Sequence, residues 1–555
     1  MTSCNSQTQP PVVPVDPDIP PVDDSKEYEK DEEGFYIVEE DYFMDTSTPD
    51  YLKQSKLRYA KSIEASRTYK QMRLYAGDKE IPLYNTKVNT SQFWNATAPQ
   101  RASNAVGILE LEGVMTFKLQ CNFAIRNECK ISPLNANVLY EVDENRRVIT
   151  FTITSTGQYT IELRSQRTLH LFVNDYKQYE AYKENDNLIY FGPGVHNASN
   201  SSYISSDHYV HLKSNQTVWI DLGAVLECGF IASNCTNFKI VGSGIVYGDC
   251  FSRDANTGSR LIPYDFSNCK NFTIEGVTTL DPAGWCYNLY FCQSVWLDNI
   301  KIISSRSNGD GISLQSCENV SCKNCFVRSW DDSLVVKNYP VWNSSKQGTT
   351  KNILFYNCIL WTDLAQSMEI GFETIGSVME NIVFDNIVVI HNFHKAPISI
   401  HNGNNAHIKQ VKFMNITIED ASMGLGDGSP ILIDFSTEFS TTWSTNHGVT
   451  ALGSIDDVLV KNVLILNGIK NPKISIKGCI DKRAEYKNSL HEITNVTLED
   501  VYLYDTLIDG GYANFDMAYT QNIVFLTTGI KATGATYQSN GAADLYGTYY
   551  TIEAV

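Results

Sequence analysis

The fold is decided by a stretch that recurs as SNCTNFKIVG (233–242), SNCKNFTIEGV (267–277), QSCENVSCKNCFV (315–327), TKNILFYNCIL (350–360) and MENIVFDNIVV (379–389). Each copy places an Asn-rich turn before a β-branched run. Steps of 34, 23, 25, 33 and 29 residues separate the equivalent positions Phe238, Phe272, Val295, Val320, Ile353 and Ile382. Strand-rich periods of this length are typical of a solenoid whose stacked coils bury their interior faces. The sequence therefore predicts an all-β protein with a right-handed parallel β-helix over residues 186–555.

Two files of identical residues follow from the same repeat. Cys235, Cys269 and Cys317 occupy one place in their coils, so stacking sets them in a row rather than around a metal ion. An Asn side chain satisfies backbone groups at a tight turn or in a left-handed conformation. We therefore assign a structural role to the second file, which consists of Asn237, Asn271, Asn319, Asn352 and Asn381.

The residues before the β-helix divide into three parts. Residues 1–50 are rich in Pro and carry 14 Asp and Glu against two Lys, a composition typical of a disordered acidic tether. Residues 51–78 are predicted to form a short basic linker with a helical conformation. Residues 79–185 alternate between short apolar segments and turn signals, which predicts a β-sandwich domain that supports the β-helix or contacts glycan.

The overall charge and hydropathy exclude two classes of partner. The 555 residues hold 44 Lys and Arg against 63 Asp and Glu, a net charge of −19. This balance disfavours nucleic acid, because a surface that binds nucleic acid presents cations to phosphate groups. The uncharged apolar runs are far shorter than the roughly 18 residues that cross a bilayer, so we expect no transmembrane segment.

Cysteine usage bears on location and on metal binding. Cys4, which precedes a stretch rich in Pro and Asp, resembles the mature start of a bacterial lipoprotein whose signal sequence is not in the chain. We therefore expect an extracellular or cell-surface protein with a candidate lipid anchor at Cys4. Cys322 and Cys325 form a CxxC pair, but no second pair or nearby His pair completes a zinc site. We expect buried thiols there, with no metal and no cofactor.

An acidic constellation is the sharpest functional signal. SNGDGISLQSC (307–317) and RSWDDSLVVKNY (328–339) place Asp310 and Asp332 22 residues apart, which is about one coil. In a parallel β-helix this register sets the two carboxylates about 4.8 Å apart along the axis, with Asp331 beside them. Mutual repulsion raises the proton affinity of such a group, which supplies the acid and the base of glycosidic bond hydrolysis. The alternatives are an Asx turn at each strand start or a calcium site.

These motifs resemble those of two glycoside hydrolase families. Asn308-Gly309-Asp310 followed by Asp331-Asp332 is similar to the motifs of family 28, the polygalacturonases. A β-sandwich followed by YFGPGVHNAS (190–199), VWIDLGAVLECGF (218–230) and a β-helix resembles family 49, the dextranases and isopullulanases. Either resemblance implies that Asp331 is the general acid and that Asp310 and Asp332 hold and activate water in an inverting mechanism.

Departures from the family 28 pattern bear on the substrate. The catalytic-site His of that family is Gln366 in this chain. The family's basic pair, which binds the sugar carboxylate, falls near PISIHNG (397–403), where no Lys or Arg occurs. Because a uronate calls for such charge-assisted contacts, this comparison favours a neutral glycan such as an α-glucan of the dextran or pullulan type.

Further residues are candidates for contacts with the sugar. Glu369 lies in register with outward-facing positions, so it either contacts a sugar hydroxyl or is a solvated strand residue. The Trp side chains are expected to stack on sugar rings or to pack in the core. The full set of predicted substrate-binding residues is Asn308, Gln366, Glu369, Lys337, Trp330, Trp285 and His401.

The sequence as a whole predicts an inverting hydrolase that acts on a polysaccharide or oligosaccharide. A polygalacturonase-like pectin hydrolase is the alternative within this class, and Lys337 would then bind a carboxylate of the sugar. A β-helix lyase is a further possibility, although a lyase needs a stronger base than a carboxylate. The alternative outside enzymes is a glycan-binding β-helix protein that keeps the Asp cluster as turns.

Overall fold

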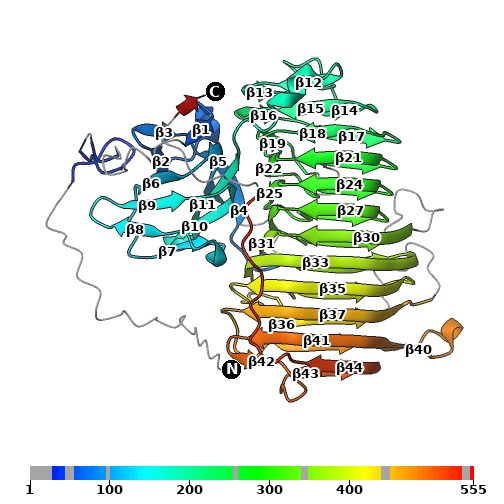
Figure 1. Cartoon of the computed structure of the whole chain (residues 1–555). Coiled ribbons are helices and arrows are strands. Elements are labelled where there is room, and N and C mark those ends of the chain that lie inside the picture. Colours follow the sequence, from blue (N-terminus) through cyan, green and yellow to red (C-terminus); the bar gives the residue numbers. More distant parts are fainter. Residues whose placement is uncertain are drawn as a thin grey trace, which may run out of the picture.

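The computed structural model describes residues 28–39, 41–43, 55–94, 101–253, 260–338, 348–438, 451–540 and 551–554. A long parallel β-helix stands beside a smaller β-sandwich (Figure 1), which confirms the predicted fold class. Among the described residues, none of the short helical turns approaches the length or apolar character of a membrane-crossing helix.

The register of the coils is the one that the repeat predicts. Val295 pairs with Phe272 and with Val320, and Ile353 pairs with Val320 and with Ile382. These positions point inward, where their side chains form one continuous apolar core along the solenoid. Each coil therefore buries its inner face only by stacking on its neighbours, as expected for this architecture.

One face of the β-helix is a parallel sheet of eleven strands, which we call the site sheet. Its strands in spatial order are β14 (Tyr209–His211), β17 (Gly229–Ser233), β20 (Tyr264–Ser267), β23 (Tyr287–Tyr290), β26 (Ile312–Gln315), β29 (Leu334–Asn338), β32 (Met368–Thr374), β34 (Ile398–Asn402), β36 (Ile431–Thr437), β38 (Lys473–Lys477) and β43 (Phe515–Ala518).

The remaining faces form a twenty-stranded sheet that wraps around the coils. Its strands are β12 (Leu188–Phe191), β13 (Gly194–His196), β15 (Thr217–Ile220), β16 (Ala224–Leu226), β18 (Lys239–Val241), β19 (Ile245–Tyr247), β21 (Lys270–Glu275), β22 (Thr278–Leu280), β24 (Gln293–Asp298), β25 (Lys301–Ile303), β27 (Glu318–Lys323), β28 (Phe326–Ser329), β30 (Gly348–Tyr356), β31 (Ile359–Thr362), β33 (Gly376–Asn392), β35 (His407–Ile418), β37 (Ser454–Ile465), β41 (Ile493–Leu503), β42 (Thr506–Leu507) and β44 (Thr520–Leu526). A hairpin of β39 (Cys479–Asp481) and β40 (Ser489–His491) projects from the side.

The predicted Asn file forms a hydrogen-bonded ladder on the outside of the turns. Asn352 donates to Asn319 and accepts from Asn381, both at 2.8 Å. All five members have a φ between 54° and 58°, the left-handed conformation that Asn tolerates better than most residues. A second ladder, which the sequence comparison does not single out, links Asn324, Asn357 and Asn386.

The β-sandwich consists of two sheets. The first contains β1 (Lys56–Tyr59), β4 (Tyr84–Asn89), β5 (Arg101–Glu112), β7 (Cys129–Ser132), β10 (Gly157–Leu163), β11 (Arg167–Asp175) and β45 (Thr551–Ala554). The second contains β2 (Met72–Ala76), β3 (Lys79–Ile81), β6 (Met115–Cys121), β8 (Tyr140–Asp143) and β9 (Val148–Ile153). The described residues also form 3-10 turns, namely η2 (Ala65–Arg67), η3 (Leu134–Ala136), η4 (Arg164–Gln166), η5 (Glu180–Glu184) and η7 (Ala484–Tyr486).

The prediction of a helical linker over 51–78 is wrong. β1 and β2 lie in this stretch and pair within the two sheets of the sandwich. In β2 the side chains of Met72, Leu74 and Ala76 are buried, whereas Arg73 and Tyr75 between them are partly exposed. This alternation with a period of two is that of a strand, and it outweighs the absence of Gly and Pro that favoured a helix.

The tether predicted for residues 1–50 is wrong in its later part. Phe35 is only 1% exposed, and the Arg73 guanidinium lies 4.1 Å from the centre of its ring. Arg73 also forms ion pairs with Asp31 and Glu33. Opposite charge and one aromatic anchor therefore hold this acidic segment on the sandwich. Residues 1–27, which include Cys4, lie outside the described residues.

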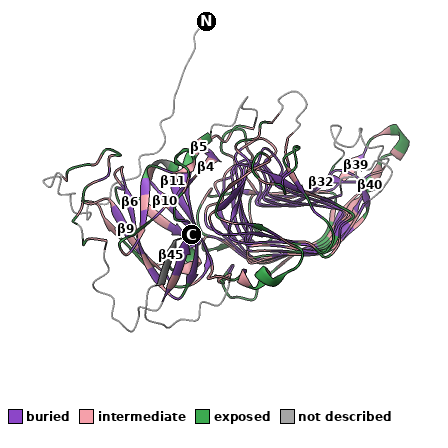
Figure 2. Cartoon of the chain, turned by 90° about the horizontal axis from the view of Figure 1, so that it is seen from above, coloured by how far each residue is buried: buried purple, intermediate pink, exposed green. Residues whose placement is uncertain are grey.

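The sandwich and the β-helix share a buried seam. Phe172 of the sandwich packs in one apolar cluster with Phe326 and Trp361 of the coils. The Arg58 guanidinium crosses the seam and binds the carboxylates of Glu110 at 3.1 Å and Asp221 at 3.0 Å. Viewed along the β-helix, the first sheet of the sandwich lies against one flank of the coils (Figure 2).

An extended segment, residues 533–540, runs along this seam and is called the strap (red trace in Figure 1). The backbone amide of Thr536 donates to Asn386 Oδ1, and Asn386 Nδ2 donates to the backbone carbonyl of Thr536. Asn357 Nδ2 donates to the backbone carbonyl of Gln538. On the other side, the Tyr537 hydroxyl donates to the Tyr159 hydroxyl at 2.6 Å. The strap therefore binds the sandwich and the second Asn ladder at once.

Candidate active site

The three predicted acids lie in two stacked turns that lead into the site sheet. Asp310 precedes β26, and Asp331 and Asp332 precede β29, which pairs with β26 in the register that the sequence predicts. The Gly311 amide donates to the Asp332 carbonyl at 2.8 Å, so the two turns are joined directly. The fold therefore brings the three carboxylates together.

The carboxylates open into a cavity of about 310 Å³. The lining side chains come from the turns before β23, β26, β29, β32 and β34, from the ends of β29 and β32, and from one segment of the sandwich. They are Trp94, Trp285, Asn308, Asp310, Asp331, Asp332, Lys337, Gln366, Phe372, Glu373 and Lys395.

The environment of the three acids favours their protonated forms. Burial, followed by the neighbouring Asp331, raises the pKa of Asp310 to about 8. Burial also raises the pKa of Asp331, and burial with the charge of Asp331 raises the pKa of Asp332. At least one proton therefore stays on the trio near neutral pH, as acid catalysis requires.

Lys337, at the end of β29, opposes the rise in the pKa values of the three acids. Its ammonium lies 3.1 Å from a Glu373 carboxylate oxygen and 3.8 Å from Asp310. Burial lowers the pKa of Lys337, but Glu373 and Asp310 outweigh burial and raise it. The resulting cation lowers the pKa of each of the three acids, so they are not all neutral at once.

The hydrogen bonds of the trio leave one fully buried oxygen without a partner among the described residues. Asp332 Oδ1 accepts a hydrogen bond from the backbone amide of Gln366 at 3.1 Å. Asp331 Oδ1 accepts one from the backbone amide of Asp332, also at 3.1 Å. Oδ1 of Asp310 is buried and has no hydrogen-bond partner among the described residues. An unsatisfied carboxylate oxygen in a cavity is a natural acceptor for water or a sugar hydroxyl.

Four of the predicted substrate-binding residues line the cavity, namely Asn308, Gln366, Lys337 and Trp285. The Asn308 amide oxygen accepts from Arg253, which fixes its orientation. The Trp285 indole lies near two cations, with the Lys337 ammonium 5.6 Å and the Arg260 guanidinium 5.3 Å from its ring. Their contacts with substrate remain predictions.

The other three predicted residues lie outside the cavity wall. Trp330 packs against Trp94, and Glu369 and His401 lie side by side on the paired strands β32 and β34. Glu369 is 1% exposed, so the alternative of a solvated strand residue is wrong. Its carboxylate accepts from His401 Nδ1 at 2.8 Å and from the Ser399 hydroxyl. His401 Nε2 lies 3.4 Å from Asp434, so this imidazole joins two carboxylates.

Four lining residues are absent from the sequence prediction, namely Trp94, Phe372, Glu373 and Lys395. Phe372 and Glu373 lie at the end of β32, and Lys395 lies only two residues before the PISIHNG stretch. This closeness to the PISIHNG stretch is the sequence signal for Lys395. Trp94 belongs to the sandwich, and no local sequence signal connects it with the acids.

The CxxC pair has a third neighbour that the sequence comparison missed. Cys358 of the next coil joins Cys322 and Cys325, and the three buried sulfur atoms lie within 4.8 Å of one another. They face the apolar core of the β-helix, as predicted for buried thiols.

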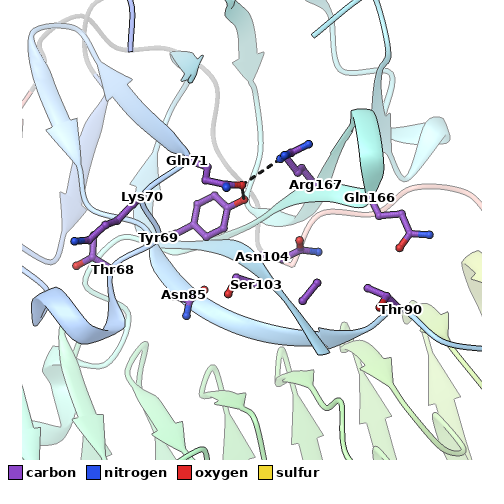
Figure 3. Close-up of a pocket in the computed structure, with 11 residues that line it drawn as sticks. Thr68, Tyr69, Lys70, Gln71, Asn85, Thr90, Ser103, Asn104, Gln166 and Arg167 are labelled. Atoms are coloured by element: carbon purple, nitrogen blue, oxygen red, sulfur yellow. Dashed lines mark hydrogen bonds between the residues drawn. The ribbon is translucent and has the colours of Figure 1, made fainter. Parts of the chain in front are cut away.

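A second cavity of about 480 Å³ lies in the sandwich (Figure 3). There Gln71 accepts hydrogen bonds from the Tyr69 hydroxyl and from Arg167, both at 3.1 Å. Among the residues that the structure describes, its lining contains no Asp, Glu or His. It therefore lacks the acid and base groups that glycosidic bond hydrolysis requires.

Comparisons with known proteins agree with this architecture. The family model for glycosyl hydrolases family 28 matches residues 195–464, which contain all three acids. A probable polygalacturonase from Arabidopsis thaliana is 26% identical over 202 residues. That match covers 35% of this chain and 40% of the relative, so the chain spans less than half of that protein.

One solved structure extends the likeness to the fold of both domains. Dex49A from Penicillium minioluteum has a TM-score of 0.53 at 11% identity, over 86% of this chain and 96% of that one. A family 28 exopolygalacturonase from Yersinia enterocolitica has a TM-score of 0.38 at 13% identity, over 80% of this chain and 95% of that one. The chain therefore resembles glycosyl hydrolases family 28 over residues 195–464 and shares the fold of Dex49A.

Proposed function

We propose that this protein hydrolyses a polysaccharide with inversion at the anomeric carbon. Asp331 donates a proton to the leaving glycosidic oxygen, and Asp310 and Asp332 hold and deprotonate the attacking water. The observation that carries this assignment is the buried trio: burial raises the pKa of all three acids, the charge of Asp331 raises the pKa of Asp310 and Asp332 further, and Lys337 lowers each of the three. Oδ1 of Asp310, which has no partner among the described residues, supports a role in holding water.

The proton balance of the reaction fits these groups. The acid enters protonated, loses its proton to the leaving sugar and recovers it from solvent. The base enters ionised and gains a proton from the water, whose oxygen forms the new bond to the anomeric carbon. An inverting site separates acid and base by about 6.5–9.5 Å so that this water fits between base and sugar.

The cavity favours an acidic sugar over the neutral glycan that the sequence comparison predicts. Lys395 lines the cavity, where its ammonium lies 4.7 Å from the centre of the Trp94 ring and its charge lowers the pKa of Asp331. A lysine at that place would bind the carboxylate of a uronate by a charge-assisted contact. The Arabidopsis relative, a probable polygalacturonase, supports the same substrate class. We therefore propose a polymer that contains uronate, such as homogalacturonan.

A substrate panel tests this function. Homogalacturonan should be cleaved faster than dextran or pullulan, and Lys395→Gln should raise KM for homogalacturonan more than it lowers kcat. Proton NMR of the first product should show the inverted anomer. Cleavage of dextran or pullulan alone would reject the acidic substrate, and a retained anomer would make one Asp a nucleophile.

The cellular location is proposed on the same basis. A polysaccharide of this kind is met outside the cell, which fits an extracellular or surface-anchored enzyme. Labelling with a fatty-acid analogue in a bacterial host, with Cys4→Ala as the control, tests the lipid anchor.

A further inference from the structure

A short segment of the sandwich reaches the cavity. Residues 90–94, which we call the arm, follow β4 and cross to the turns that precede the site sheet. The Trp94 amide donates to Asp427 Oδ1 at 2.9 Å in the turn before β36, and the same oxygen lies 2.6 Å from His394 Nε2. The arm is therefore docked on the β-helix by its backbone.

A glycine makes this docking close. Gly426 has a φ of +62°, and a Cβ atom there would collide with the Gln92 carbonyl of the arm. The left-handed conformation and the missing side chain let the two backbones approach.

The Trp94 ring stands between the acids and the later coils. Its centre lies 4.9 Å from the ring of Trp330, which directly precedes the catalytic pair, and 6.4 Å from the ring of His394. The Lys395 ammonium lies 4.7 Å from the centre of the same ring. Among four consecutive coils, Trp94 thus contacts the turns before β29, β34 and β36.

The cavity ends where Trp94 stands. Its described lining runs from Trp285, in the turn before β23, to Lys395, in the turn before β34, and includes nothing from the coils after Lys395. The turns before β29 and β34 are two coil steps apart, or about 10 Å. That distance matches a short piece of sugar chain beyond the catalytic pair.

We propose that Trp94 closes this end of the cavity and makes the hydrolase cut at chain ends, releasing short products. The sandwich thereby supplies the residue that decides the mode of action, although the acids all come from the β-helix. Trp94 is a specificity-determining wall rather than an open stacking surface, since Trp330 and Lys395 already lie against its ring. This inference rests on the proposed hydrolysis of a polysaccharide.

The test compares product lengths from homogalacturonan, dextran and pullulan. For the polymer that is cleaved, the wild type should release one short product from the first time point with little loss of viscosity. Trp94→Ala should release longer oligosaccharides and lower the viscosity several-fold more per bond cleaved. Phe93→Ala is the matched control, because Phe93 is 58% exposed and lies outside the cavity lining. Trp94→Phe, which keeps an aromatic wall and is the milder change for folding, should keep the wild-type products.

The outcomes separate the two proposals. A ladder of mid-chain fragments from the wild type, or identical products from Trp94→Ala and the wild type, would overturn the closed end while leaving the hydrolase in place. If none of the polymers were cleaved by the folded wild type, the proposed function would fail and the closed end with it. A change in products with Phe93→Ala equal to that with Trp94→Ala would show that the ring of Trp94 is not the wall.

Discussion

The surroundings of Asp331 change its acidity, because burial raises the pKa of its carboxyl group. Three further carboxylates, those of Asp310, Asp332 and Glu373, and two lysines line the same cavity, so protons are distributed over a coupled group rather than held by one residue. The sequence predicts the trio because its members recur at one coil spacing. It does not predict Glu373 or Lys395, because neither belongs to the repeated motif.

Asp331→Asn should lower kcat by about 10² to 10⁴, the usual contribution of general acid catalysis, with the fold retained. Asn has nearly the same volume and cannot donate a carboxyl proton. Initial rates on the polymer and a circular dichroism spectrum measure the two effects. Activity close to that of the wild type would remove Asp331 from the role of proton donor.

Lys337→Met should move the acidic limb of the pH–rate profile to higher pH. The lysine cation lowers the pKa of all three acids, so its loss lets the base ionise only at higher pH. Rates at acidic pH should therefore fall more than rates at alkaline pH. Lys351→Met is the control, since Lys351 pairs with Glu380 on the surface. An unshifted limb would show that Lys337 does not tune the trio.

His401→Gln should destabilise the fold in a way that depends on pH. Burial lowers the pKa of His401, but Glu369 and Asp434 outweigh burial and raise it to about 10. The protonated form therefore contributes stability that is complete below the ordinary pKa of about 6.5 and is lost as the pH rises through about 10. Removal of one partner from a buried charge pair costs about 3–5 kcal/mol.

Denaturant unfolding between pH 6 and pH 10 checks this prediction. The difference in unfolding free energy between wild type and His401→Gln should shrink across that range. His211→Gln serves as the reference, because His211 and its partner Asp207 are both exposed. A difference that stays constant with pH would mean that the imidazole is neutral in the fold.

At the scale of elements, the coils are held in register by their turns as well as by their core. Phe272, Val295 and Val320 are equivalent in sequence and paired in space, so the repeat alone predicts the register. The helix predicted for residues 51–78 fails because the basic residues of that stretch alternate with apolar ones at a strand period. The absence of Gly and Pro is therefore weaker evidence for a helix than the period of apolar residues is for a strand.

Asn352 of the first ladder offers a measurable test of the turns. Asn352→Ala should cost about 2–4 kcal/mol, from the strained left-handed conformation of a non-Gly residue and about 1 kcal/mol for each lost ladder bond. Asn352→Gly loses the bonds without the strain, so it should cost less. Thermal unfolding of both variants measures the difference. Equal costs would assign the whole effect to the hydrogen bonds.

At the scale of the whole molecule, a buried ion pair between Arg58 and Asp221 joins the sandwich to the β-helix. Arg58 lies 163 positions before Asp221 in the chain, and both are buried at the seam. Sequence patterns report which residues are apolar or periodic, but not which distant surfaces meet. For this reason neither the seam nor the arm could be predicted from the sequence.

Arg58→Met should destabilise the protein by about 3–5 kcal/mol, because the carboxylates of Glu110 and Asp221 would stay buried without their common cation. Lys56→Met, on the same strand, removes an exposed pair with Glu112 and should cost less than about 1 kcal/mol. Unfolding curves of the two variants give the comparison. Similar small costs would show that the seam tolerates an unpaired carboxylate.

The strap has a consequence for biosynthesis. Because the ribosome extends the chain toward its carboxyl end, residues 533–540 emerge after strands β1 to β11 of the sandwich and after every coil that they contact. Until then, Asn357 and Asn386 on the coils and Tyr159 on the sandwich lack the partners that later join them. The last strand of the sandwich, β45, emerges later still, so the joint between the two domains is completed only at the end of synthesis.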